Sequence, residues 1–174
     1  MLIVGASGGV GTFAVQLAKL FGAEVTGVCS TRNLELVRSL GADHVVDYTR
    51  EDFAGNGRRY DRIFQLAGTR SPADCRRALT PGGQLILSSG EGAGRRIGPL
   101  GRMLEAVVPS PFVSQRLGAF EVKPIGDDLR ALSELVEVGR LAPVIDRTYP
   151  LPETPAVLRH LETGHARGKV VITV

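Results

Sequence analysis

The stretch that decides the fold is Leu2-Ile3-Val4-Gly5-Ala6-Ser7-Gly8-Gly9-Val10-Gly11, a short apolar run that leads directly into closely spaced glycines. Residues 2–6 have the composition of a buried strand, and an amphipathic helix is expected to begin at the glycines. Helix-start amides and the helix dipole attract anions, so a glycine turn between a strand and a helix predicts a phosphate-binding site. The apolar residues of the expected helix are spaced i, i+4, i+7 and i+8 and define one face, which consists of Phe13, Leu17, Leu20 and Phe21.

The same glycines resemble the dinucleotide-binding fingerprint. In that fingerprint, successive glycines allow a tight turn, close approach of a pyrophosphate, and close packing of the helix on the strand. Here Ala6, Gly8 and Gly11 fill the three positions, and Gly5 can supply the flexibility that Ala6 lacks. Because the strand-turn-helix context is present, cofactor binding is favoured over a purely structural turn. The expected contacts in this turn are Ala6, Gly8, Gly9, Val10 and Gly11.

The rest of the chain alternates strands and helices, which predicts a doubly wound parallel sheet of the Rossmann type with six strands. A helix opening at Ser71-Pro72 is expected from its cap residue and its proline at the first helical position. A helix capped by Asp127 is expected to face inward with Leu129, Leu132, Leu135 and Val136. Residues 90–118 are interpreted as a covering segment. The expected strands are 2–6, 24–29, 44–48, 61–67, 84–89 and one within 119–125, followed by a strand at 143–151, a helix at 152–163 and a strand at 169–174.

The composition of the chain excludes several classes of function. The chain has 174 residues, 43% hydrophobic, with a net charge of +3, which describes one globular domain with at most a short appendage. Aromatic residues make up only 5% and acidic residues are mixed among the basic ones, which argues against nucleic-acid binding. No apolar run approaches the length of a membrane helix, and no signal peptide follows Met1. We therefore expect a cytoplasmic protein without nucleic-acid or membrane partners.

No metal site and no catalytic residue are expected from the sequence. Cys29 and Cys75 do not combine with His44, His160 and His165 in any familiar zinc spacing. The three histidines lie in regions where a solvated or structural role is favoured over proton transfer. The proton donor of any reaction therefore stays unassigned.

The end of the second expected strand reads Ser30-Thr31-Arg32. A free ribose 2′-hydroxyl is usually bound by an Asp or Glu at this place, and none is present. Two hydroxyls and a guanidinium suit a 2′-phosphate instead, which favours NADP (NADPH) over NAD. The alternative is that Ser30 and Thr31 only cap the next helix and that Arg32 is solvated.

The same turn also fits the G-x-x-x-G-x-G pattern of short-chain dehydrogenases, at Gly5, Gly9 and Gly11. The short-chain family needs a Tyr-x-x-x-Lys pair, but Asp52, Phe64 and Glu153 lie four residues after the three tyrosines, Tyr48, Tyr60 and Tyr149. The chain resembles instead the quinone oxidoreductase-like branch of the medium-chain dehydrogenase/reductase superfamily over its whole length. The segments that carry the resemblance are residues 5–11, 14–19 and 22–25, Leu40-Gly-Ala-Asp-His-Val-Val-Asp-Tyr48, Pro81-Gly-Gly83 and Gly168-Lys-Val-Val171.

This resemblance implies further site residues and a division of the chain. It implies that Tyr48 lies near the adenosine phosphate, and the fold places Ala67, Ser88 and Ser89 at the crevice for ribose and nicotinamide. It also implies residues 1–139 as the NADP-binding domain and 140–174 as a segment that completes a GroES-like catalytic domain, so the chain resembles a truncated homologue. The phenylalanine-glutamine pair at 64–65 departs from the family pattern.

The implied activity is zinc-independent hydride transfer from NADPH to a small-molecule electron acceptor, a quinone or a conjugated carbonyl. The alternatives are a non-catalytic NADPH-binding module and a dimerisation module, since family members commonly associate as homodimers through this domain.

Overall fold

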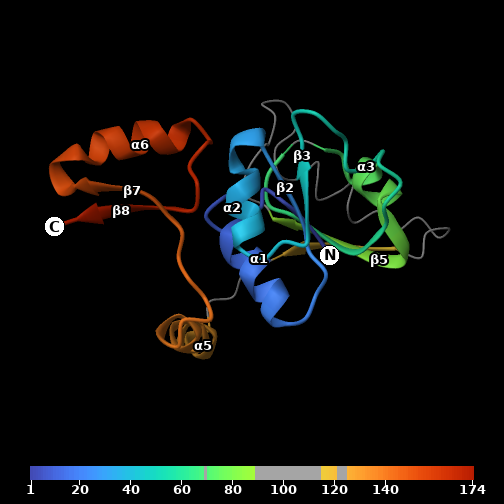
Figure 1. The fold of residues 1–174 in the computed structure, drawn as a ribbon, viewed down its shortest axis with the longest axis horizontal. Coiled ribbons are helices and arrows are strands. Elements are labelled where there is room, and N and C mark those ends of the chain that lie inside the picture. The colour runs from blue at the N-terminus through green and yellow to red at the C-terminus, as the bar shows by residue number, and fades with distance from the viewer. Residues whose placement is uncertain (69, 89–114, 121–124) are drawn as a thin grey trace.

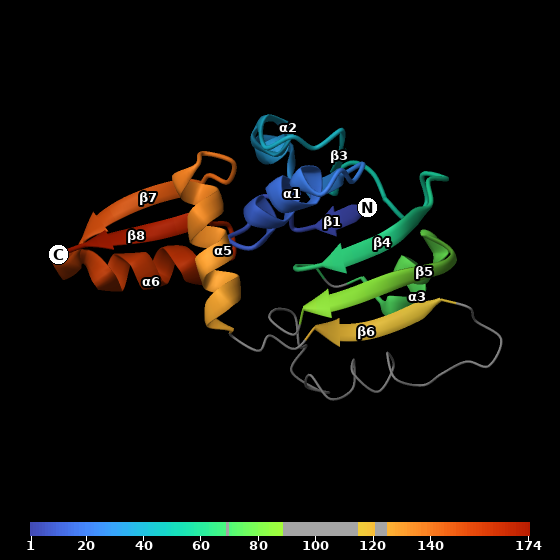
Figure 2. The ribbon, with the colours of Figure 1, turned by 90° about the horizontal axis from the view of Figure 1, so that it is seen from below.

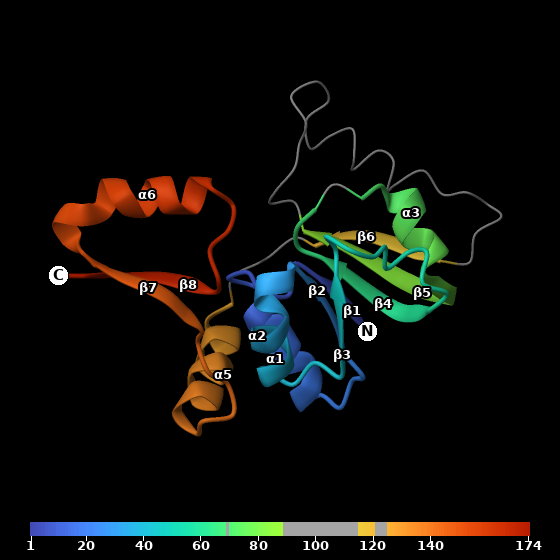
Figure 3. The same ribbon diagram turned by 45° about the horizontal axis from the view of Figure 1, so that its top comes forward.

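The computed structural model describes residues 1–68, 70–88, 115–120 and 125–174. Six parallel strands form one sheet in the order β3-β2-β1-β4-β5-β6 (Figure 2 and Figure 3). The chain builds the sheet outward from β1 in both directions, because β1 pairs with β2 on one side and with β4 on the other. The predicted doubly wound parallel sheet is therefore confirmed. The strands are β1 (Leu2–Val4), β2 (Thr26–Cys29), β3 (His44–Asp47), β4 (Tyr60–Gln65), β5 (Leu79–Ser88) and β6 (Arg116–Phe120).

Helices cover both faces of this sheet (Figure 3). On one face lie α1 (Gly11–Leu20), the short 3-10 turn η1 (Thr31–Asn33) and α2 (Leu34–Ser39), and on the other lies α3 (Pro72–Arg77). Because side chains alternate along a strand, Ile3 packs into the core under α1 and α2, whereas Leu2 and Val4 pack into the core under α3. The central strand β1 is thus buried on both sides, as is typical of parallel sheets.

The inward face of α1 consists of small residues and one valine. Val15 is fully buried with Gly11, Thr12 and Ala18, whereas Phe21 is 84% exposed. The face predicted from the spacing of Phe13, Leu17, Leu20 and Phe21 is therefore not the one that is buried against the sheet. Small residues on the opposite side let the helix backbone approach the sheet more closely than a row of large side chains would.

Several strand boundaries also differ from those predicted from the sequence. The hydroxyl of Ser71 accepts the N–H of Asp74 at 3.1 Å and caps α3, as predicted. However, β5 already begins at Leu79, so the Pro81-Gly82-Gly83 turn lies within it and Gly82 takes a φ of +80°. The sixth strand begins at Arg116 and not within 119–125, and most of the expected covering segment, residues 90–114, lies outside the described residues.

Helix α5 (Gly126–Glu137) forms where a helix was predicted but does not face inward. None of its residues is buried, and Leu129 is 62% exposed. In Figure 1 it lies outside the layers made by the sheet and α1 to α3. The apolar spacing predicted the helix correctly, but no described element packs over its apolar side.

A second unit follows at the C-terminus (Figure 1). It consists of β7 (Ile145–Pro150), the 3-10 turn η2 (Leu151–Glu153), α6 (Thr154–Glu162) and β8 (Lys169–Thr173), with β7 and β8 paired in parallel. The predicted strand-helix-strand appendage is confirmed in its order. None of the helices in the described residues combines the length and apolar character needed to cross a membrane.

Candidate functional site

The glycine turn closes β1 directly onto the start of α1. Gly5 has a φ of +86°, a conformation that favours glycine, and its N–H and that of Ala6 both donate to the carbonyl of Val28. A Cβ at Gly11 would lie 2.0 Å from the carbonyl oxygen of Gly5, so no side chain fits there. Gly5 therefore supplies the tight turn that the fingerprint assigns to the Ala6 position, and Gly11 supplies the close packing of helix on strand.

The turn is open at Gly8. A Cβ at Gly8 would meet only the Gly5 carbonyl oxygen, at 3.4 Å, which is ordinary contact. The first turn of α1 carries no acidic side chain, so the partial positive charge at the helix start is not neutralised locally. The Gly8 N–H already donates to the Gly5 carbonyl at 3.1 Å, so the helix-start amides from Gly9 onward, and not that of Gly8, suit an anion.

A lysine from the C-terminal unit lies at this turn, and the sequence analysis did not assign it a role. The N–H of Gly168 donates to the carbonyl of Ser7 at 2.9 Å. The next residue, Lys169, places its Nζ 3.2 Å from where a Cβ at Gly9 would lie and 6.0 Å from the ring centre of Phe13. The only signal in the sequence was the Gly168-Lys169 pair of the resemblance, because 160 residues separate Lys169 from Gly9.

The end of β2 is fixed to the glycine turn through Asn33. This side chain is 5% exposed, and its Nδ2 donates to the hydroxyl of Ser7 at 3.0 Å and to that of Ser30 at 3.2 Å. Arg32 is exposed, and its Nη2 donates to the carbonyl of His165 at 2.8 Å. The predicted residues Ser30 and Arg32 therefore border the same end of the sheet as the turn.

Thr31 points elsewhere, to a carboxylate that the sequence analysis missed. Its hydroxyl donates to Asp47, the last residue of β3, which also accepts the N–H of Thr49 at 3.0 Å. The Thr31 hydrogen bond, with those from Thr49 and the nearby charge of Arg50, holds the pKa of Asp47 below its usual value against the opposing effect of burial. A carboxylate directly after the apolar pair Val45-Val46 was the available signal. Asp47 ends β3 and not β2, so it lies outside the strand end at which the fingerprint places a carboxylate.

Cys29 lies beside Asp47 at the end of β2. The two residues are register partners in β2 and β3. Burial, followed by the charge of Asp47, raises the pKa of the Cys29 thiol to about 11. The thiol is thus protonated near neutral pH. Tyr48, the next predicted site residue, is 57% exposed, and its N–H donates to the carbonyl of Cys29.

The ends of β4 and β5 border the turn from the other side. A Cβ at Gly5 would lie 2.8 Å from the Cβ of Ala67, so Ala67 lies against the start of the turn. Ser88 ends β5 and is half-buried, and Ser89 lies outside the described residues. Gln65 is buried, and its Nε2 donates to the carbonyl of Arg70 at 3.2 Å, which holds the loop after β4.

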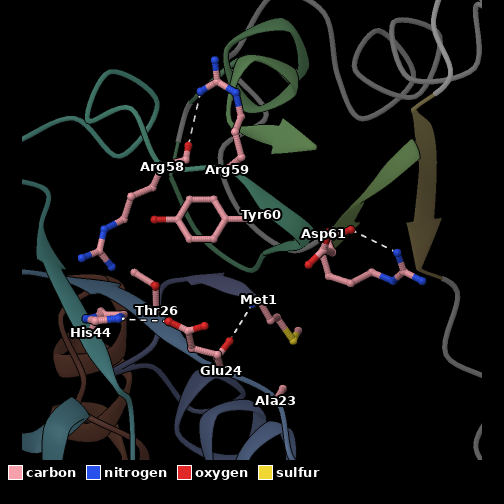
Figure 4. Close-up of a pocket in the computed structure, with 10 residues that line it drawn as sticks. Met1, Ala23, Glu24, Thr26, His44, Arg58, Arg59, Tyr60 and Asp61 are labelled. Atoms are coloured by element: carbon pink, nitrogen blue, oxygen red, sulfur yellow. Dashed lines mark hydrogen bonds and ion pairs between the residues drawn. The ribbon is translucent and has the colours of Figure 1, made fainter. Parts of the chain in front are cut away.

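A cavity of about 580 Å³ opens at the opposite edge of the sheet (Figure 4). Its lining residues precede or begin the strands and carry mixed charge, with His44 paired to Glu24 at 3.1 Å. Its position excludes contact with the glycine turn, because the amino ends of parallel strands share one edge and the carboxyl ends the other. The lining consists of Met1, Ala23, Glu24, Thr26, His44, Arg58, Arg59, Tyr60, Asp61 and Arg62.

Two of the three histidines lie away from the carboxyl edge. His160 pairs with Asp146 at 2.7 Å within the C-terminal unit, and His44 lies at the amino edge. Within the described parts of the chain, no three His, Cys, Asp or Glu side chains gather in a way that could hold a metal ion. The arrangement can bind a phosphorylated ligand, and no group in it is assigned to proton transfer.

Comparison with known proteins gives a consistent result. Residues 40–172 match the family model of zinc-binding dehydrogenases. The mitochondrial NAD(P)H oxidoreductase RTN4IP1 of Mus musculus is 37% identical over 99% of this chain and 47% of its own length. The chloroplastic NADPH-dependent alkenal/one oxidoreductase of Arabidopsis thaliana is 35% identical over 99% and 40%. The quinone oxidoreductase structure from Coxiella burnetii superposes with a TM-score of 0.83 at 29% identity, over 99% of this chain and 52% of that one.

The chain spans about half the length of the curated relatives it matches. The prediction of a cytoplasmic location is wrong, since these relatives are mitochondrial or chloroplastic proteins. That prediction rested on the lack of a signal sequence after Met1, which carries no information on the compartment when only half of a relative's length is spanned.

Proposed function

The chain belongs to the zinc-binding dehydrogenase family, and from this premise we propose that it binds NADPH and serves an oxidoreductase of the quinone reductase type. One observation carries the proposal. The turn from Gly5 to Gly11 closes β1 onto the start of α1 at the point where the strand order reverses, which is where open α/β sheets bind nucleotides. The residues proposed to hold the pyrophosphate are Ala6, Gly8, Gly9, Val10 and Gly11, with Lys169 supplying a positive charge.

The proposed adenosine end lies at β2 and β3, with Ser30, Thr31, Arg32 and Tyr48. Among the described residues, no carboxylate lies within ion-pair distance of Arg32, so its charge is available to a 2′-phosphate. Asp47 lies nearby, but hydroxyl groups of Thr31 and Thr49 bind its carboxylate. The role of Thr31 in the proposal is to hold Asp47 and not to donate its hydroxyl hydrogen to the phosphate.

The nicotinamide end is proposed to lie at Ala67, Ser88 and Ser89. NADPH supplies the hydride when it is bound, and this chain's residues bind and orient it. The family's name mentions zinc, but the described residues offer no set of three ligands that fits it. The proposal therefore assigns no step to a metal.

The proposed acceptor is a small molecule with an electron-poor conjugated system. Relatives are named for quinone, for alkenal/one and for 2-methylene-furan-3-one substrates. These compounds share a carbon-carbon double bond conjugated to a carbonyl group. Such a conjugated system accepts hydride at a carbon atom. A quinone or a conjugated carbonyl is therefore the substrate class we propose.

We also propose that residues 1–139 form the nucleotide-binding domain and that residues 140–174 contribute to a second, catalytic domain. The support is the exposure of β7 and β8, in which no residue is buried. A two-stranded sheet is only marginally stable alone, and further strands would stabilise it. The exposed apolar side of α5 favours a second candidate function, a module that associates as a homodimer.

The test is a titration of the purified chain with NADPH and with NADH, followed by nicotinamide fluorescence. Arg32→Ala is expected to weaken NADPH binding about tenfold or more and leave NADH binding unchanged, because it removes charge-assisted hydrogen bonds to the 2′-phosphate. Arg62→Ala is the matched control, since Arg62 is an exposed arginine at the opposite edge of the sheet. A folded chain that binds neither cofactor contradicts the proposal. Turnover of a quinone separates an enzyme from a binding module.

A further inference from the structure

Arg32 is held by a residue 133 positions away in the sequence. Its Nη2 donates to the carbonyl of His165, in the loop of residues 163–168 between α6 and β8, at 2.8 Å. A guanidinium carries five N–H donors in a planar fork, so one bond to a neutral carbonyl leaves donors for an anion. The contact therefore fixes the arginine without neutralising it.

The 163–168 loop is itself anchored at both ends. At its start, the Thr163 hydroxyl donates to the carbonyl of His160 at 2.6 Å and accepts the N–H of His165 at 3.3 Å. At its end, the N–H of Gly168 donates to Ser7 in the glycine turn at 2.9 Å. A Cβ at Gly168 would lie 2.3 Å from the carbonyl oxygen of Val144, so the loop backbone is closely packed there. These contacts set the position of the His165 carbonyl.

We propose that the 163–168 loop positions the Arg32 guanidinium, so that the C-terminal unit sets part of the preference for NADPH over NADH. The inference rests on the proposed role of Arg32 at a 2′-phosphate. An exposed arginine samples many rotamers, and a ligand that binds it must restrict them. A carbonyl that already restricts the side chain reduces this entropic cost for the 2′-phosphorylated cofactor alone. Thr163 is then a positioning residue that acts through His165 and Arg32.

The experiment uses Thr163→Val, which replaces the hydroxyl with a methyl group of similar size. We expect the affinity for NADPH to fall about three- to tenfold, the range of one net hydrogen bond, with the affinity for NADH unchanged. Thr154→Val is the matched control, because the Thr154 hydroxyl makes the same i to i−3 bond to a carbonyl, that of Leu151, at the other end of α6. Thr163→Ser keeps the hydroxyl and is expected to retain the selectivity of the natural chain.

The same substitution in an Arg32→Ala background completes the test. If Thr163 acts through Arg32, Thr163→Val has no further effect on NADPH binding there. An equal loss of affinity for NADPH and NADH, or a loss that persists without Arg32, overturns the positioning role while leaving the proposed function intact. If Arg32→Ala alone keeps the full preference for NADPH, or the natural chain binds neither cofactor, the 2′-phosphate site and the positioning role both fail.

Discussion

The two sheets of this molecule are held in different ways. Every residue of β1 and β2 is buried between two helical layers, whereas β7 and β8 contain no buried residue. In the C-terminal unit, Val157 of α6 is buried at 4% exposure. The six-stranded sheet therefore carries an extensive core of its own, whereas the C-terminal unit buries little and contacts the glycine turn and α1 through Gly168 and Ala142. The candidate site lies where these two regions meet.

The largest effect is expected at the turn that both regions use. Gly11→Val is expected to abolish cooperative unfolding in urea, because its Cβ would lie 2.0 Å from the Gly5 carbonyl oxygen and a native stability of only about 5–15 kcal/mol cannot absorb such a clash. Gly8→Ala is the control, since its Cβ makes ordinary contact, and it should fold. A cooperative transition of normal midpoint for Gly11→Val contradicts the close packing of α1 on β1.

A pair of core substitutions tests whether the two regions unfold separately. Ile63→Ala, in the fully buried centre of β4, is expected to cost about 2–5 kcal/mol and to raise amide exchange throughout the chain. Val157→Ala removes less apolar surface and is expected to cost about 1–2 kcal/mol. Its exchange increase should be confined to residues 145–173, as measured by mass spectrometry. Equal increases in both regions for Val157→Ala would show that they form one cooperative unit.

The same contrast separates what the sequence could predict from what it could not. The path from β1 through the glycines to α1 follows from local rules, because turn residues and strand composition act within a few positions. Local rules do not predict which face of α1 is buried. The side with Phe13 and Leu17 and the side with Val15 and Ala18 could both pack on the sheet, and only the close approach of the helix selects the second. Helix α5 was predicted correctly as a helix and wrongly as an inward-facing one for a similar reason.

The candidate site divides in the same way. Gly8, Arg32 and Ala67 were predicted from their places after strands, and they border one edge of the sheet in the structure. Asp47 and Lys169 were missed. Their positions depend on the pairing of β3 with β2 and on the docking of the C-terminal unit, and neither is encoded in local spacing.

A smaller effect is expected where the C-terminal unit is attached to α1. The side chain of Gln16 donates to the carbonyl of Ala142 and accepts its N–H, both at 2.9 Å. Gln16→Met keeps the length of the side chain but loses both bonds, at a cost of about 1–2 kcal/mol for the attachment. We expect faster amide exchange in residues 142–173 and unchanged exchange in β1 and β4. Gln16→Glu retains the acceptor and loses the donor, so its exchange rates in this segment should lie between those of the natural chain and those of Gln16→Met. Unchanged exchange in the C-terminal unit would show that Gly168 and Ser7 suffice to hold it.

The smallest effect concerns pH and again differs between the regions. Because the pKa of Asp47 is lowered in the folded chain, its ionised form stabilises the fold above the ordinary carboxyl pKa, and this contribution is lost as the pH falls below about 4. Thr31→Val removes the largest cause of the lowered pKa, so its urea midpoint should lie below that of the natural chain at pH 7 and approach it at pH 3. Thr173→Val, which removes a bond to the Tyr149 carbonyl in the C-terminal unit, involves no carboxylate and should shift the midpoint equally at both pH values. If the difference in urea midpoint between Thr31→Val and the natural chain is the same at both pH values, the Thr31 hydroxyl stabilises the fold through packing alone. The charge of Asp47 would then not stabilise the edge of the sheet that carries the candidate site.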